Sequence, residues 1–274
     1  MEHEVLVIEA GRGERHYWTD LWRYRELFFY LAWRDLLVRY KQTAIGVAWA
    51  VIRHVLTMVV FTLVFGKLAK LPSGNVPYPV LVFAALLPWQ LFATTFTESG
   101  HSLVTNANLI SKVYFPRLVI PASAVLVSLA DFAIALAILA MLMAWYGMAP
   151  GWQIAALPLF TLLAIAAAIS AGIWTAALNV KYRDVRFIIP FVVQMGLYIS
   201  PVGFSSAIIP EDWRWLYAMN PLVGVIDGFR WAVSGGTTPL YPSSVAISVA
   251  VIAVLLASGI RYFRRTEKTF ADVI

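Results

Sequence analysis

Long apolar segments constrain the fold of this chain more than any other feature. Six such segments occur in the sequence: 47–65, 78–97, 118–146, 154–178, 187–204 and 240–262. A helix needs roughly 20 apolar residues to cross a bilayer, and most of these segments are that long. The chain is 61% hydrophobic, above the about 45–50% that is usual for soluble domains. We therefore expect an all-α integral membrane protein with six transmembrane helices.

The Lys and Arg residues gather on one side of the predicted membrane. Sixteen of the 21 lie in four segments, namely 1–46, 102–117, 180–186 and 261–274. The opposite face carries four: Lys67, Lys70, Arg214 and Arg230. Loops rich in Lys and Arg stay in the cytoplasm, so we expect both termini there. This placement explains the net charge of +6 without nucleic-acid binding.

An amphipathic helix is predicted within the N-terminal segment 1–46. Thr19 or Asp20 can cap it, and it would run to about Val38. Its apolar residues fall on one stripe: Leu21, Tyr24, Leu27, Phe28 and Leu31. We expect this helix to lie in the membrane interface, followed by the transmembrane domain 47–264 and a cytoplasmic tail 265–274.

The segment 200–236 breaks the pattern of long spans. It is apolar and aromatic, but Pro201, Gly203, Pro210 and Pro221 interrupt it. Short re-entrant helices before the last span fit this composition, because non-helical backbone is tolerated at membrane depth where protein or water surrounds it. A folded outer loop on the surface is the alternative.

The sequence carries no constellation typical of an enzyme. Gly66-Lys67 lacks the upstream glycine of a phosphate-binding loop. The four histidines do not have the spacing of metal ligands. We therefore expect no catalytic site, metal or cofactor in this chain. If the chain transports a substrate, the energy must come from a partner or an ion gradient.

Two charged positions lie away from the ends of the predicted spans, where charges are costly and usually functional. Asp131 lies about halfway along its segment. It could relay protons, or it could be a structural carboxylate bonded to a neighbouring helix. Arg53 lies early in the first span. It could bind a lipid diphosphate through its guanidinium, or it could extend to the lipid headgroups.

Aromatic residues indicate a candidate substrate pathway. Trp89, Phe92 and Phe96 share one helix face by their spacing, and Tyr198 and Phe204 end the fifth span. Ring faces suit the apolar faces of sugars, so these residues could line a polymer channel. Packing and interfacial anchoring are the alternative.

Two short basic loops are candidate contacts with a soluble partner. The loop 102–117 carries Asn108, Leu109, Lys112 and Phe115, a mixture that could dock in a groove. The loop 180–186 carries Arg183 and Asp184. Charge that only sets topology is the alternative for both.

Several motifs along the chain carry a family resemblance. They are Arg34-Asp35, Arg39-Tyr40-Lys41-Gln42-Thr43, Gly46, Trp49-Ala50, Asn108-Leu109-Ile110-Ser111-Lys112, Phe115-Pro116-Arg117, Tyr182-Arg183-Asp184-Val185, Ser200-Pro201-Val202, Asn220-Pro221, Gly224 and Arg230. In this order they resemble the membrane permease of ABC-type polysaccharide exporters, the O-antigen, capsule and teichoic-acid exporters. The chain departs from the family at Arg53-His54, where relatives often have Gln-Pro.

This resemblance implies a homodimer in the bacterial inner membrane with two copies of a separate ATPase subunit, which would hold ATP and Mg. Loop 102–117 would be the coupling helix, loop 180–186 a second contact, and the interface helix with Arg34, Asp35 and Arg39 a third. Segment 200–236 would gate the outer mouth. The expected cargo is a polyprenyl-diphosphate-linked polysaccharide, with O-antigen the leading candidate.

Three other functions remain open from the sequence. The first is an ABC exporter of small molecules or drugs. The second is an ion-coupled transporter that uses Asp131, and the third is a membrane scaffold without an ATPase partner. Transport that survives without an ATPase and fails when Asp131 is neutralised would identify the second.

Overall fold

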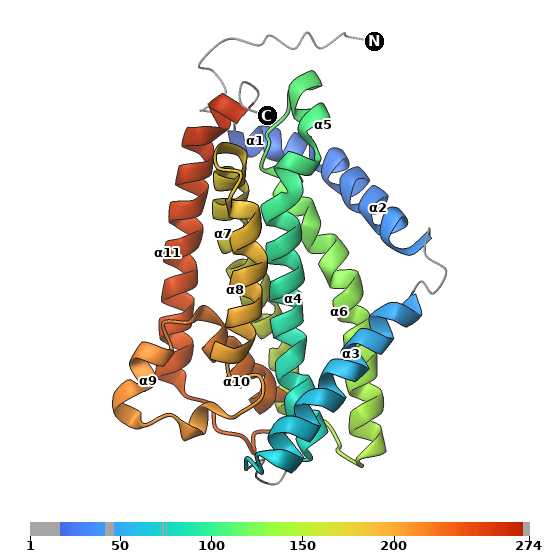
Figure 1. Cartoon of the computed structure of the whole chain (residues 1–274), viewed down its shortest axis with the longest axis vertical. Coiled ribbons are helices and arrows are strands. Elements are labelled where there is room, and N and C mark those ends of the chain that lie inside the picture. Colours follow the sequence, from blue (N-terminus) through green and yellow to red (C-terminus); the bar gives the residue numbers. More distant parts are fainter. Residues whose placement is uncertain (1–16, 42–46, 73, 75, 271–274) are drawn as a thin grey trace.

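The computed structural model describes residues 17–41, 47–72, 74 and 76–270, and every regular element in these residues is helical (Figure 1). The elements are α1 (Tyr17–Arg23), α2 (Arg25–Lys41), α3 (Val47–Phe61), η2 (Thr62–Leu68), α4 (Tyr78–Thr105), α5 (Ala107–Lys112), α6 (Val119–Trp145), η3 (Trp152–Ala156), α7 (Leu157–Lys181), α8 (Val185–Ile199), η4 (Ser206–Ile208), α9 (Glu211–Tyr217), α10 (Pro221–Val233), α11 (Pro242–Thr266) and η5 (Glu267–Thr269). The predicted tails outside these ranges, and the motif residues Gln42, Thr43 and Gly46, lie outside the described residues.

Among the described residues, five helices are long and apolar enough to cross a membrane. They are Ala48–Leu68, Tyr78–Thr105, Val119–Trp145, Trp152–Lys181 and Pro242–Thr269. The fifth predicted span corresponds to α8, a shorter apolar helix of 15 residues. At 1.5 Å per residue, α8 is about 22 Å long, less than the roughly 30 Å of the hydrocarbon core. The all-helical class is therefore confirmed, with five long spans and one shorter apolar helix.

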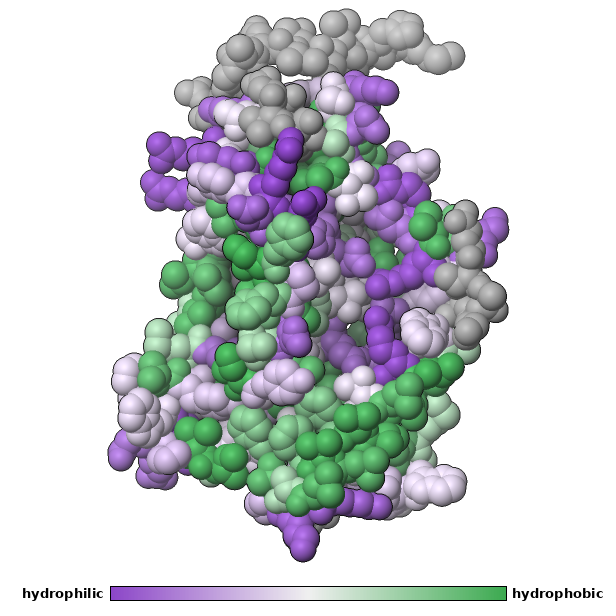
Figure 2. Space-filling view, viewed as in Figure 1, coloured by the Kyte–Doolittle hydropathy of each residue, from purple (hydrophilic) through white to green (hydrophobic). Residues whose placement is uncertain are grey.

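The bundle has two ends with different elements. α1, α5 and the C-terminal end of α11 lie together at one end, and α9 lies at the other (Figure 1). We call these the α5 end and the α9 end. In the view of Figure 2, hydrophilic residues gather towards the α5 end, while hydrophobic residues dominate over α3 at the other.

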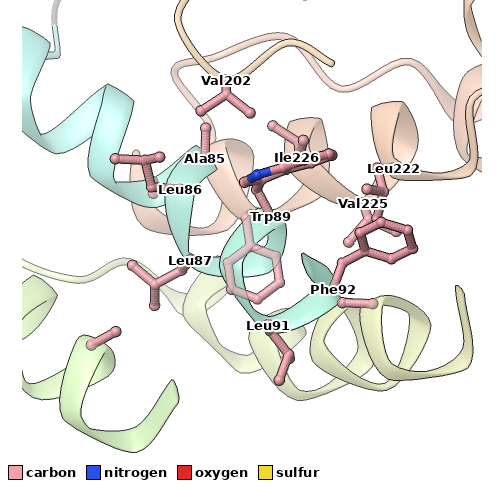
Figure 3. Close-up of a cluster of buried hydrophobic side chains, with 14 of the residues drawn as sticks. Ala85, Leu86, Leu87, Trp89, Leu91, Phe92, Val202, Leu222, Val225 and Ile226 are labelled. Carbon is pink, nitrogen blue, oxygen red and sulfur yellow. The ribbon is translucent and has the colours of Figure 1, made fainter. Parts of the chain in front are cut away.

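Helix α4 forms the centre of the bundle. In its most apolar stretch 78% of residues are buried, against 22% in the helix that includes α3. α4 packs against α6, α7, α8 and α10. Small residues allow the close approach of α7: a Cβ atom on Gly172 would lie 2.6 Å from the Cβ of Ser99. The main core surrounds α4, and Figure 3 shows its contact with α10.

The predicted interface helix is two helices, α1 and α2, separated at Tyr24. The predicted stripe packs inward: Leu31 is buried, and Leu21, Tyr24, Leu27 and Phe28 pack against a second core at the α5 end. The opposite face is also aromatic, with Trp22, Phe29, Tyr30 and Trp33 exposed. The segment is therefore less amphipathic than predicted. Exposed Trp and Tyr are typical of a membrane interface.

Residues 200–236 contain no long helix, as their prolines and glycines predicted. They form a turn, η4, α9 and α10. α10 begins where the Asn220 side chain accepts a hydrogen bond from the backbone N–H of Leu222, 3.1 Å away, with Pro221 at its first position. Nearly all of α10 is buried against α4, α7 and α11.

Candidate functional site

Side chains from α2 and α3 contact one buried carboxylate, that of Asp131 in α6. Asp131 is 5% exposed. Arg39 Nη1 from α2 lies 3.3 Å from its Oδ2 atom, and Arg53 Nη2 from α3 lies 3.8 Å from the same atom. The Tyr40 hydroxyl donates a hydrogen bond to Oδ1. Arg39 Nη2 also lies 3.5 Å from Glu98 Oε1 of α4. We call these five residues the Asp131 cluster.

The Asp131 cluster favours the structural interpretation of this carboxylate over the proton relay. A buried carboxylate is tolerated when cations and hydrogen bonds surround it, and removing its partners is costly. Burial, together with the hydrogen bond to Asp131, raises the pKa of Tyr40 to about 12, so Tyr40 stays a hydrogen-bond donor at cellular pH. The cluster thus connects α2 and α3 to α6.

Arg53 and His54 have different surroundings although they are adjacent. His54 is 3% exposed, and its Nδ1 lies 2.6 Å from the carbonyl oxygen of Ala50 in the same helix. The Arg53 side chain remains 48% exposed. Arg53 is therefore accessible from outside the bundle, and its phosphate-binding role stays a prediction.

A cavity of about 260 Å³ lies between α2, α4 and α6, on the α5 side of Asp131. Its lining includes Arg34, Asp35, Arg39, Glu98, His101 and Ser123. Arg34 bridges its two sides: Nε donates to Asp35 Oδ1 at 2.8 Å, and Nη2 donates to Asn106 Oδ1 at 2.9 Å. Because Asn106 directly precedes α5, Arg34 links α2 to α5.

The loop 102–117 exposes a different apolar group from the one predicted. Phe115 is 3% exposed and packs in the second core, as does Ile110. Asn108 and Lys112 are exposed, Leu109 is partly buried, and Val113 and Tyr114 are 51% and 59% exposed. Phe115 therefore anchors the loop and cannot contact a partner from this position. Tyr114, which the sequence did not single out, is the aromatic residue on the surface.

The C-terminal turn η5 holds this loop in place. The backbone N–H of Arg117 donates to Glu267 Oε1 at 2.8 Å, and the Arg117 guanidinium donates to the Glu267 carbonyl oxygen. Phe270 is fully buried and lies edge-on to Phe263. Burial and the neighbouring Glu267 carboxylate raise the pKa of Tyr17 in α1. The residues 267–270, treated as a simple tail from sequence, are part of the packed α5 end, and we call them the C-terminal clasp.

Removing the clasp carboxylate should loosen the α5 end. We expect Glu267→Ala to lose about 1–3 kcal/mol of unfolding free energy, because the part-buried backbone N–H of Arg117 loses its acceptor. Thermal unfolding in detergent should show a melting temperature lower by about 2–4 °C for each kcal/mol lost. Glu211→Ala is the matched control, since its side chain is 90% exposed. Equal melting temperatures for the two variants would contradict the clasp.

The second basic loop is exposed at the α5 end. Arg183 and Asp184 lie between α7 and α8, and both are exposed. Their position on the same end as Tyr114 is what a second contact with one partner requires (Figure 1). Their coupling role stays a prediction.

The predicted aromatic face is buried behind α8. Trp89, Phe92 and Phe96 are 4%, 7% and 2% exposed, and neighbouring ring centroids lie 5.6 Å apart. Figure 3 shows Trp89 and Phe92 among the side chains of α10. Trp89 also packs on Gly196 of α8, where an added Cβ would lie 2.6 Å from the indole. In a single chain Trp89 therefore supports α8, and none of the three rings faces an open space, so a pathway role remains a prediction.

The two later aromatic residues are more accessible. Tyr198 on α8 is 60% exposed, and Phe204 is partly buried, with its ring centroid 6.5 Å from that of Tyr217. Of the predicted pathway aromatics, Tyr198 is the one on an open surface of the chain.

A buried arginine fixes the segment that follows α8. Arg230 of α10 is 3% exposed. Its guanidinium donates to the carbonyl oxygens of Phe204, Val202 and Leu81 at 2.6, 2.9 and 3.2 Å. One turn earlier, Asp227 accepts a 2.6 Å hydrogen bond from the Ser206 hydroxyl. We call this the Arg230 clamp; it ties residues 202–206 to α10 and α4.

The chain resembles known membrane permeases over most of its length. It is 28% identical to the O-antigen export system permease protein RfbA of Klebsiella pneumoniae, covering 88% of this chain and 92% of that protein. It is 29% identical to the RfbA of Myxococcus xanthus, covering 93% and 98%. It is 24% identical to the polysialic acid transport protein KpsM of Escherichia coli, covering 86% and 91%.

The pattern that defines the ABC-2 type transporter family matches residues 26–233, from α2 to the end of α10. Members of this family are multi-pass membrane subunits that pair with ABC ATPase subunits and need no cofactor of their own. In the described part of this chain, no group of three or more His, Asp or Glu residues could hold a metal ion. The chain belongs to the ABC-2 type transporter family, as a membrane permease subunit without an ATPase domain.

Proposed function

We propose that this chain is the permease of an ATP-driven exporter that moves lipid-linked polysaccharide, with O-antigen as the leading candidate, out of the cytoplasm. The observation that carries this proposal is the similarity to two O-antigen export permeases over 88% and 93% of the chain. The family match over residues 26–233 includes the Asp131 cluster, the Arg230 clamp and the loop 102–117, which we call the α5 loop. The proposed location is the bacterial inner membrane.

The proposed orientation places the α5 end in the cytoplasm. Lys112 of α5 and Arg264 near the C-terminal end of α11 lie in elements at this end (Figure 1). Arg34 of α2 hydrogen-bonds Asn106 directly before α5, and cytoplasmic segments carry the excess of Lys and Arg. With α8 and the turn that follows it as the sixth crossing, both termini are cytoplasmic. α9 and α10 then form the outer end. α10 is buried in protein on nearly all sides, which supports a re-entrant position.

Coupling to the ATPase is proposed at the exposed part of the α5 end. Lys112, Val113 and Tyr114 offer a charge beside an apolar group, which suits a groove on a soluble subunit. Arg183 and Asp184 supply the second contact. α2 is the third element, because Arg34 binds Asn106 beside α5. Two ATPase copies and two permease copies make the proposed assembly.

The proposed cargo pathway runs along α8 at the homodimer interface. Tyr198 is exposed on this helix. Trp89, Phe92 and Phe96 form a rigid layer behind it, and Phe204 lies at its outer end. An aromatic wall lets a polymer slide without fixed hydrogen bonds, because sugar rings have apolar faces.

A strain that lacks this chain tests the cargo directly. The proposal predicts that lipid-linked polysaccharide accumulates inside the cell, that surface polysaccharide is lost, and that a plasmid copy of the gene restores export. Unchanged surface polysaccharide with altered drug tolerance would favour a small-molecule exporter instead. The ion-coupled alternative has little support, because Asp131 is paired with two arginines.

A further inference from the structure

We propose that Asp131 occupies the place of the substrate's phosphates in the empty permease, and that Arg39 and Arg53 exchange this carboxylate for the diphosphate of the lipid carrier. The proposed function supplies the class of ligand on which this inference rests. The exchange itself rests on the geometry of the Asp131 cluster.

The two arginines converge on one oxygen and hold it loosely. Arg39 and Arg53 approach the same Oδ2 atom, at 3.3 and 3.8 Å. Charge-assisted hydrogen bonds between a cationic N–H and an anionic oxygen are usually about 2.7–2.9 Å long. Arg39 Nη1 and Asp131 Oδ2 are both buried, and neither makes a hydrogen bond. Guanidinium donors are therefore gathered around an anion position that the carboxylate fills incompletely.

A diphosphate matches this arrangement better than a carboxylate does. Guanidinium groups bind phosphate oxygens through paired hydrogen bonds. Each of the two phosphates of a diphosphate could therefore bind one arginine. Asp131 offers one negative charge to both, and its other oxygen already accepts the Tyr40 hydroxyl.

The ligand also has access to the two cations. Arg53 is 48% exposed on α3, and Arg39 lines the cavity of about 260 Å³ between α2, α4 and α6. This cavity lies towards the α5 end, which is the proposed cytoplasmic side. A lipid headgroup at that surface could reach both arginines, with its lipid tail remaining in the membrane.

The exchange would connect substrate binding to the ATPase contact. When the diphosphate binds Arg39 and Arg53, the buried Asp131 carboxylate loses both of its cations. An unpaired buried charge is costly, so this state favours separation of α2 and α3 from α6. α2 is bound to Asn106 beside α5 through Arg34. Movement of α2 would therefore reach the α5 loop, so substrate would stimulate ATP hydrolysis.

Neutralising Asp131 gives the sharpest test. The probe is farnesyl diphosphate, with farnesol as the control, added to the permease–ATPase complex in lipid nanodiscs. Asp131→Asn keeps the size of the side chain and an acceptor for Tyr40, and removes the competing charge. We expect about tenfold tighter binding of farnesyl diphosphate. We also expect raised basal ATP hydrolysis that farnesyl diphosphate no longer stimulates.

Arg53→Gln provides a second variant, which leaves the Asp131 side chain and its contacts with Arg39 and Tyr40 in place. We expect it to bind farnesyl diphosphate about tenfold more weakly than wild type. Asp212→Asn, which changes an exposed acidic residue of α9 at the opposite end of the bundle, is the matched control and should behave as wild type. Wild-type binding that neither Asp131→Asn nor Arg53→Gln changes would overturn the exchange while leaving the proposed function intact. No binding by wild type would overturn both.

Discussion

Tyr114→Asp is expected to separate the permease from its ATPase subunit. Tyr114 is 59% exposed beside Val113, at 51%, just after α5. An aromatic residue at the centre of an interface often contributes 2 kcal/mol or more to binding. A charge in its place must also be desolvated, so we expect at least about 30-fold weaker association. Co-purification from mild detergent, assayed by ATP hydrolysis, measures this effect.

The control for this variant is Tyr146→Asp. Tyr146 is 43% exposed and follows α6, at the end opposite α5. Tyr146→Asp introduces the same charge on a surface that the ATPase is not proposed to touch, so the ATPase should still co-purify with the permease. If Tyr114→Asp retains the ATPase as well as Tyr146→Asp does, the α5 loop is not the docking site.

A substitution of Phe115 cannot test whether the ATPase docks on this loop. Because it is 3% exposed, Phe115→Ala would leave a cavity and cost about 3–5 kcal/mol. Loss of the ATPase in that variant would report a loosened loop and not a missing contact. The exposed pair Val113 and Tyr114 separates these two effects.

Arg230→Met is expected to release the outer segment from the bundle. The substitution removes three hydrogen bonds to the carbonyl oxygens of Leu81, Val202 and Phe204. Loss of one member of a buried charged network costs about 3–5 kcal/mol. We expect a melting temperature lower by about 6 °C or more. We also expect a small dye to leak through the outer end of the permease in proteoliposomes.

Two further variants isolate the role of the guanidinium. Arg230→Lys keeps the charge but offers a compact ammonium instead of a planar fork, so it should lose part of the stability. Arg265→Met removes an exposed arginine at the α5 end and should change neither measurement. Full stability and a tight outer end in Arg230→Met would show that the Arg230 clamp does not hold this segment.

The sequence predicted the long helices well, because a membrane span is visible as an apolar run. The structure places α4, α6, α7 and α11 at the expected segments, and α4 continues eight residues beyond the predicted 97. That extension carries Glu98 and His101, polar residues that an apolar pattern does not include. α8 ends before Ser200-Pro201, five residues short of the predicted 204.

The sequence could not predict which faces are covered. The spacing of Trp89, Phe92 and Phe96 correctly gives a common face, but spacing does not reveal that Gly196 allows α8 to pack on it. The burial of Phe115 was unpredictable for the same reason, because an apolar residue in a short loop can point to a partner or to the core. The break at Tyr24 likewise has no marker such as proline or glycine.

Contacts between distant parts of the chain were the least predictable. Asp131 and Tyr40 are 91 residues apart, and Arg117 and Glu267 are 150 apart. The sequence showed that Asp131 and Arg53 were unusual, since charges are costly in a span. Their convergence depends on how α2, α3 and α6 pack, which local pattern does not determine.

Transport by the reconstituted complex tests the central claim most directly. Proteoliposomes containing the permease and its ATPase are loaded with a fluorescent polyprenyl-diphosphate glycan, and ATP is added to the side that carries the ATPase. The account predicts that the glycan appears on the opposite face only with hydrolysable ATP and the ATPase present. Glycan movement without the ATPase, driven by a proton gradient and abolished by Asp131→Asn, would contradict it.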